Sequence, residues 1–115
     1  MGSGDAFEAR VYEYVAQELA EEKLGILPRA ARIYPPHSKR YYSKDRRSCI
    51  AVDIAIEVSR AGASDPYMLW IWECKDSSSL INVAEVEEFH AKLEQMGRDK
   101  TKGTMAATNG FQTAA

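Results

Sequence analysis

Two short apolar segments of this chain carry charged residues at positions where a buried strand normally has none. Residues 49–58 alternate between large apolar residues and small or acidic ones, with Asp53 in the middle of the run. Residues 67–75 are almost entirely apolar until Glu73 and Lys75 near the end. An ionised group without a partner is costly to hold away from water. We therefore expect both segments to be strands and the three charged side chains to form a site.

The rest of the chain predicts an α/β fold in which helices flank a mixed sheet. Apolar residues recur at three- and four-residue spacing in residues 5–23 and 83–97, which indicates two amphipathic helices. Residues 30–34 are expected to form a short strand followed by a loop, and residues 102–108 another strand. Residues 109–115 are expected to begin a further helix.

The composition, with 45% hydrophobic and 28% charged residues, is that of an ordinary soluble protein. No apolar run approaches the roughly 20 residues that a membrane helix needs, and the N-terminus has no signal-peptide pattern. Cys49 and Cys74 lie in predicted strands without metal-ligand spacing, so we expect them to be reduced and buried. These features predict one cytoplasmic domain spanning residues 1–115.

Positive charge is concentrated in residues 29–47, where seven basic residues and one acidic residue give a net charge of +6. The other eight basic and sixteen acidic residues give −8, so the chain as a whole carries −2. A local basic patch can bind a phosphate backbone even on an acidic protein; a solvated loop that only aids solubility is an equal alternative. The candidate nucleic-acid contacts are Lys39, Arg40, Lys44, Arg46 and Arg47.

A hairpin between the two charged strands would bring Asp53 opposite Glu73. If the turn is centred on Ala63, the numbers of any two facing residues add up to 126. Facing side chains on an antiparallel pair begin about 4.5–5.5 Å apart, close enough for two carboxylates to share a hard cation. Lys75 would lie on the same face, about 7 Å farther along the strand.

This set of residues matches metal-assisted hydrolysis of a phosphodiester. A divalent ion held by Asp53 and Glu73, with the backbone carbonyl of Cys74 as a further ligand, would lower the pKa of its water and act as a Lewis acid. Lys75 would orient the nucleophile and stabilise the developing charge. The alternative is a cross-strand ion pair between one acid and Lys75, or an edge strand that faces solvent.

The residues also resemble the PD-(D/E)XK nuclease superfamily, and within it the Mrr-like restriction endonuclease branch. The resembling motifs occur in the family's order and span almost the whole chain. They are Gly4-Asp5-Ala6-Phe7-Glu8-Ala9-Arg10-Val11, Asp53, Glu73-Cys74-Lys75, Val86-Glu87-Glu88-Phe89, Lys102-Gly103-Thr104, Thr108-Asn109-Gly110-Phe111-Gln112 and Ala114.

The resemblance implies a restriction-endonuclease-like αβββαβ core and Mg²⁺-dependent cleavage of DNA, with Mn²⁺ as a substitute ion. It implies that Asp53, Glu73 and Lys75 are catalytic, and that Glu8 points from the first helix toward the metal site. A capping box between Asp5, as the N-cap, and Glu8 is the competing interpretation of Glu8.

The expected partner is DNA, no membrane is involved, and a homodimer is left open. Because such domains usually continue beyond the last motif, we expect residues 1–115 to be a single nuclease-like domain shortened at its C-terminal end. A catalytically silent nucleic-acid-binding or assembly domain with the same fold is the alternative function.

Other polar and aromatic residues have simpler explanations. Trp70 and Trp72 are expected to point away from Glu73 and to pack against the helix at 83–97. Lys92 is expected on the outer face of that helix. His37 lies in the basic loop and is not included in the site.

Overall fold

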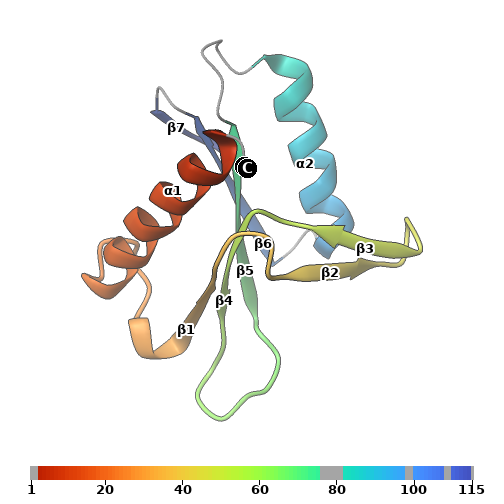
Figure 1. The fold of residues 1–115 in the computed structure, drawn as a ribbon. Helices are drawn as coiled ribbons and strands as arrows, with labels where there is room; N and C mark the ends of the chain where they lie inside the picture. Colours follow the sequence, from red (N-terminus) through yellow and green to blue (C-terminus); the bar gives the residue numbers. More distant parts are fainter. Residues whose placement is uncertain (1–2, 76–81, 98–99, 108–109, 115) are drawn as a thin grey trace.

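The computed structural model describes residues 3–75, 82–97, 100–107 and 110–114. Its helices and strands are arranged as a sheet with one long helix on each side (Figure 1). In chain order they are α1 (Ser3–Ala20), the 3-10 helix η1 (Pro28–Ala30), β1 (Ala31–Tyr34), β2 (Arg40–Ser43), β3 (Ser48–Ala51), β4 (Ile54–Val58), β5 (Met68–Lys75), α2 (Val83–Gly97), β6 (Thr101–Ala107) and β7 (Gly110–Ala114).

The main sheet has five strands in the order β1-β4-β5-β6-β7. Strand β5 pairs antiparallel with β4 and parallel with β6, so the predicted mixed sheet flanked by helices is confirmed. Helix α2 provides the crossover that a parallel pair requires. The predicted hairpin register is also confirmed, because Ile54 faces Trp72 and Val58 faces Met68.

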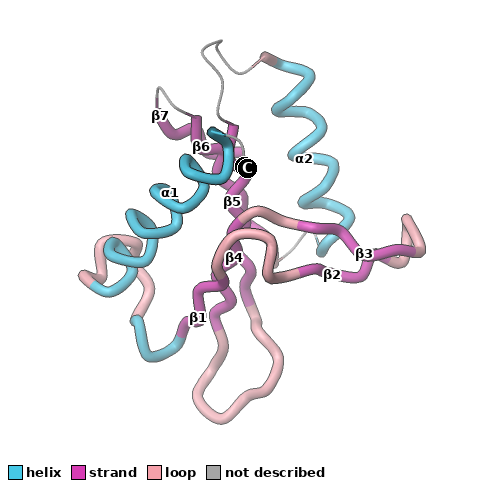
Figure 2. Tube along the Cα trace, viewed as in Figure 1, coloured by secondary structure: helices cyan, strands magenta, loops and turns pink. Residues whose placement is uncertain are grey.

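The prediction of one continuous strand over residues 49–58 is wrong. The chain bends at Val52 and Asp53, and this bend separates β3 from β4 (Figure 2). Strand β3 pairs with β2 in a separate two-stranded sheet, so part of the predicted loop after β1 is a hairpin. The bend also sends apolar residues to opposite sides: Ile50 packs on the α2 side and Ile54 on the α1 side.

Residues 110–114 form strand β7, so the predicted helix start is wrong there; residues 108, 109 and 115 lie outside the described part. Strand β7 pairs antiparallel with β6, from Gly103 opposite Ala114 to Ala107 opposite Gly110. Because β6 pairs with β5 along only one side, its other side offers unpaired backbone groups. Pairing with β7 gives these N–H and C=O groups hydrogen-bond partners. This gain outweighs the local sequence preference for a helix at residues 110–114.

Each face of the sheet has its own apolar core. On one face, Val11 and Val15 of α1 pack with Ile56 and other strand residues. On the other, Phe89 and Leu93 of α2 pack with Ala55, Leu69, Ile71 and Ile50.

Trp70 and Trp72 belong to the α1 core, so their predicted packing against α2 is wrong. The strand alternation places Leu69 and Ile71 on the α2 face, and the two tryptophans must therefore face α1. Their rings stack with centroids 5.3 Å apart, and Trp70 Nε1 donates a hydrogen bond to Thr104 Oγ1 at 2.9 Å.

Helix α2 lies very close to β6 because residue 103 is glycine. A Cβ placed there would lie 2.8 Å from Phe89 Cε2 and would also clash with Leu93 Cδ1. This contact fixes the height of α2 above the sheet, and with it the position of every α2 side chain that reaches toward β5.

Both cysteines are free thiols, as predicted, but the predicted burial is wrong for Cys49, which is exposed. Its neighbour Ile50 takes the inward position in the hairpin, which leaves Cys49 on the outer side. Cys74 is half-buried. In the part of the chain that the structure describes, no helix combines the length and apolarity required to cross a membrane.

Candidate catalytic site

Asp53 lies at the bend just before β4, one residue beyond the last pair between β4 and β5. Its Oδ2 accepts a hydrogen bond of 2.8 Å from the backbone N–H of Cys74, and only 15% of its side chain is exposed. The bend therefore precedes the first residue of β4, while the side chain of Asp53 remains hydrogen-bonded to the backbone of β5. This bond places the carboxylate beside Glu73, as the predicted register required.

Glu73 extends toward α2 and is 16% exposed. Its Oε2 accepts a hydrogen bond of 3.0 Å from Lys92 Nζ. Burial raises the pKa of Glu73, and the negative charge of Asp53, which lies within hydrogen-bonding range, raises it further; the Lys92 ammonium opposes both. The two acids predicted to converge are thus adjacent, and their repulsion is only partly compensated.

Lys75 lies two residues beyond Glu73 on the same side of β5 and lines the same cavity, which has a volume of about 390 Å³. Lys92 and Arg46 line this cavity as well. Of the predicted group, Asp53 is adjacent to Glu73, and Glu73 shares this cavity with Lys75, whereas Asp53 does not line it. The ammonium bound directly to Glu73, however, belongs to Lys92 rather than to Lys75.

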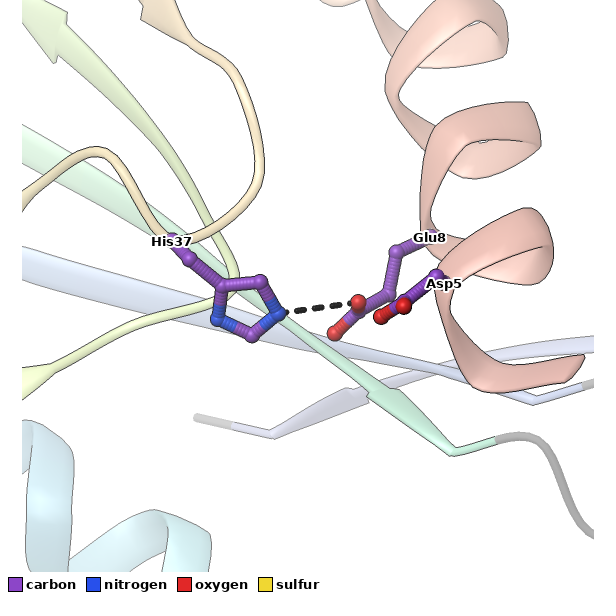
Figure 3. Close-up of side chains that lie close together, drawn as sticks. All are labelled: Asp5, Glu8 and His37. Carbon is purple, nitrogen blue, oxygen red and sulfur yellow. Dashed lines mark hydrogen bonds and ion pairs between the residues drawn. The ribbon is translucent and has the colours of Figure 1, made fainter. Parts of the chain in front are cut away.

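Glu8 points from α1 toward the loop between β1 and β2, where His37 Nε2 donates a hydrogen bond of 2.9 Å to Glu8 Oε1 (Figure 3). The other ring nitrogen, Nδ1, lies 3.9 Å from Asp53 Oδ1. His37 therefore lies between Glu8 and Asp53. The hydrogen bond to Glu8 is the main cause that raises the pKa of His37, with smaller contributions from the charges of Asp53 and Asp5.

Asp5, Glu8 and His37 form a second group that could hold a metal ion, since their possible ligand atoms all lie within 4.8 Å of one another. Helix α1 begins at Ser3, so Asp5 lies inside the first turn and the prediction that it is the N-cap is wrong. Glu8 is therefore placed by its bond to His37, which links α1 to the bend at Asp53.

His37 and Lys92 are the two site residues that the sequence-based prediction missed. His37 is held near Asp53 by a backbone hydrogen bond from His37 N–H to the Asp53 carbonyl at 3.1 Å. This contact joins two loops, and no sequence pattern predicts it.

Lys92 was expected on the outer face of its helix, and this prediction is wrong. It follows Phe89 by three residues and precedes Met96 by four, so its helical position alone could have identified it.

The structure separates the predicted nucleic-acid contacts into two groups. Lys39 is engaged internally, with its Nζ 3.2 Å from Glu57 Oε2 and 4.7 Å from the centre of the Tyr34 ring. The other four are exposed on the β2–β3 hairpin or its turn, and of these Arg46 lines the cavity beside Glu73. The exposed members are Arg40, Lys44, Arg46 and Arg47.

Cys74 contributes its backbone to the site. Its N–H holds Asp53, while the role of its carbonyl as a metal ligand stays a prediction. Burial raises the pKa of the Cys74 thiol, and the charges of Asp53 and Glu8 raise it further, so the sulfur remains protonated. A protonated thiol is a poor nucleophile and a poor metal ligand.

The fold and the site together define an α/β protein with a mixed sheet and a paired-carboxylate site at the start of β4. Comparison of the chain with protein-family models, with curated proteins and with solved structures finds no match.

Proposed function

We propose that this protein is a metal-dependent endonuclease that hydrolyses DNA phosphodiester bonds at Asp53, Glu73 and Lys75. The observation that carries the proposal is the proximity of two poorly exposed carboxylates, Asp53 at the bend before β4 and Glu73 of β5, the second of which lines a cavity together with Lys75. Burial of two adjacent carboxylates costs free energy, because each loses water and repels the other. A positive charge between them would offset this cost.

The order of the elements supports a restriction-endonuclease-like fold. Helix α1, strands β1, β4 and β5, helix α2 and strand β6 follow the proposed αβββαβ order, with the β2–β3 hairpin inserted after β1. Strand β7 extends the sheet beyond that order.

The donor set at the two acids suits Mg²⁺ or Mn²⁺, which prefer oxygen ligands. Asp53 and Glu73 would hold the ion, with the Cys74 carbonyl as a third ligand. The raised pKa of Glu73 supports this assignment, because a cation between the two acids would offset both burial and repulsion. When bound, such an ion supplies Lewis acidity to a phosphoryl oxygen and makes a coordinated water more acidic.

The protein's own cations would act on the substrate phosphate. Lys75 and Arg46 line the cavity next to Glu73, where their N–H groups would bind phosphate oxygens and stabilise the charge that develops during cleavage. Lys92 holds the Glu73 carboxylate on the α2 side. His37, between Glu8 and Asp53, would keep the Asp53 carboxylate oriented toward Glu73.

Cleavage of supercoiled plasmid DNA with Mg²⁺ or Mn²⁺ tests the proposal. We expect Asp53→Asn and Lys75→Ala each to lower the nicking rate by about 10²–10³-fold, the usual size of such electrostatic contributions. Asp65→Asn and Lys23→Ala are matched controls, since both residues are exposed and neither lines the cavity beside Glu73. Equal rates for Asp53→Asn, Lys75→Ala and wild type would contradict the assignment.

A catalytically silent nucleic-acid-binding domain is the second candidate. The ion pair between Lys92 and Glu73 favours it, because it already neutralises one of the two acids without a metal. Binding of the plasmid without metal-dependent cleavage would select this function over the nuclease.

A further inference from the structure

A larger cavity lies at the opposite end of β4 from Asp53. It has a volume of about 1130 Å³ and is bounded by η1, β1, β4 and the turn between β4 and β5. Charged and aromatic side chains dominate its polar lining, and none of them belongs to the cavity beside Glu73. They are Arg29, Arg32, Tyr34, Lys39, Glu57, Arg60 and Tyr67, and we call this cavity the arginine groove.

The arginine groove carries an excess of positive charge on an acidic protein. Lys39 and Glu57 largely neutralise each other at 3.2 Å, and Tyr41 Oη donates a further hydrogen bond of 2.7 Å to the same carboxylate. This leaves three guanidinium groups, those of Arg29, Arg32 and Arg60. All three residues are exposed, and none takes part in an ion pair within the described residues.

An aromatic ring lies next to these cations. Tyr67 is 52% exposed, and the guanidinium of Arg60 lies 5.7 Å from the centre of its ring. An exposed flat ring beside arginines can stack on a nucleic-acid base while the arginines bind the phosphates. An acidic peptide would use the charges but would give the ring no comparable role.

The groove opens on the same face of the sheet as Glu73. Arg32 faces Glu57 across the β1–β4 pair, and Tyr34 packs with the α2 core. Ser59 lies six positions beyond Asp53, a separation that spans about 20 Å of extended strand. One strand of duplex DNA covers that distance in about six nucleotides.

We propose that the arginine groove binds the phosphodiester backbone of DNA some six nucleotides from the bond at the acid pair. The proposal rests on the proposed function for the identity of its ligand. Arg29, Arg32 and Arg60 bind phosphates, and Tyr67 stacks on an unpaired base where the DNA is single-stranded.

Fluorescence anisotropy with a labelled 20-nucleotide single strand and with its duplex, both in EDTA, tests this directly. We expect Arg32→Glu and Arg60→Glu each to weaken binding at least tenfold and to reduce its salt dependence. Arg10→Glu is the matched control, because it makes the same charge change at an exposed arginine of α1 outside both cavities. Thermal melts verify that these surface variants remain folded.

Tyr67→Ala separates the two forms of DNA. A loss confined to the single strand assigns the ring to base stacking, and an unchanged affinity for both forms assigns binding to the phosphates alone; both results support backbone binding. Arg32→Glu and Arg60→Glu that bind like Arg10→Glu would overturn the proposal. So would a poly-glutamate peptide that binds wild type while neither oligonucleotide does.

The binding measurement needs neither metal nor cleavage. It therefore tests the arginine groove independently of the nuclease proposal. Loss of affinity in the groove variants with no cleavage by wild type keeps the groove and rejects the nuclease. Cleavage by wild type with unaltered binding in the groove variants supports the nuclease and rejects the groove.

Discussion

The two faces of the central sheet are covered in different ways, and they differ in the charge that the central strands β4 and β5 carry toward them. The α1 face lies under one long helix, and the β4 and β5 residues that face it, such as Ile54, Ile56 and Trp72, are apolar. The α2 face is covered by α2 and by the β2–β3 hairpin, and its strand residues include Glu57 and Glu73.

This difference has a simple physical basis. A continuous helix excludes water from the strand residues beneath it, so a charge there would be unpaired. Two separate covering elements leave part of the face open. Arg46 of the hairpin and Lys92 of α2 both line the cavity beside Glu73, and no described residue of either element lines the cavity beside Glu57. The face with the poorer cover is therefore the one that can hold charged side chains within reach of water and ligands.

Matched core substitutions should show the largest effect. Ile56 and Ile71 are both fully buried, one on each face. We expect Ile56→Ala to lower the free energy of unfolding by about 2–5 kcal/mol. Ile71→Ala should cost less, because the less continuous cover of the α2 face can relax into the space. Urea denaturation measures both values, and an equal or greater loss for Ile71→Ala would break the comparison.

A substitution at Gly103 should disturb the α2 face alone. A Cβ there meets the ring of Phe89 and a methyl group of Leu93, so we expect Gly103→Ala to cost about 1–3 kcal/mol of unfolding free energy. Leu93→Ala in the same chain removes part of the clash. A double-mutant cycle should therefore give a combined cost below the sum of the two single costs, and simple additivity would argue against the close contact.

Neutralising Glu73 should have a smaller and pH-dependent effect. Its pKa is raised by burial and by Asp53, so its protonated form stabilises the fold below the usual value of 4.5, and this contribution is lost as the pH rises through the folded pKa. In EDTA at neutral pH we therefore expect Glu73→Gln to melt above wild type. The difference should shrink toward pH 4, and a lower melting temperature at neutral pH would show that the Lys92 ion pair outweighs the burial cost.

The smallest effect concerns His37 at the edge between the two faces. Its pKa is raised above the usual 6.5, mainly by the hydrogen bond to Glu8. The associated stability is present below pH 6.5 and fades as the pH rises through the folded pKa. We expect NMR titration to show a lower His37 pKa in Glu8→Gln and a smaller decrease in Asp5→Asn. An unchanged His37 pKa in Glu8→Gln would contradict the observed bond.

Much of the acid pair could be predicted because it depends on local patterns. The alternation in residues 54–58 and 68–72 and the intervening turn set the hairpin register, and this register brought Asp53 next to Glu73. Helix α2 was equally predictable, since a 3.6-residue period shows which residues form an apolar face.

The remaining features depended on contacts between distant segments. Alternation shows that two sides differ, but it does not show which helix covers each side, so the position of Trp70 and Trp72 was predicted on the wrong face. The bend at Val52, the pairing of β7 with an open strand edge and the placement of His37 between Glu8 and Asp53 were likewise decided by the tertiary structure. The sequence alone determined the spacing of apolar residues in the helices and strands and the register of one hairpin, because these depend on residues that are close in the chain. Which element covers each face, and which side chains meet there, was decided only when the whole chain packed.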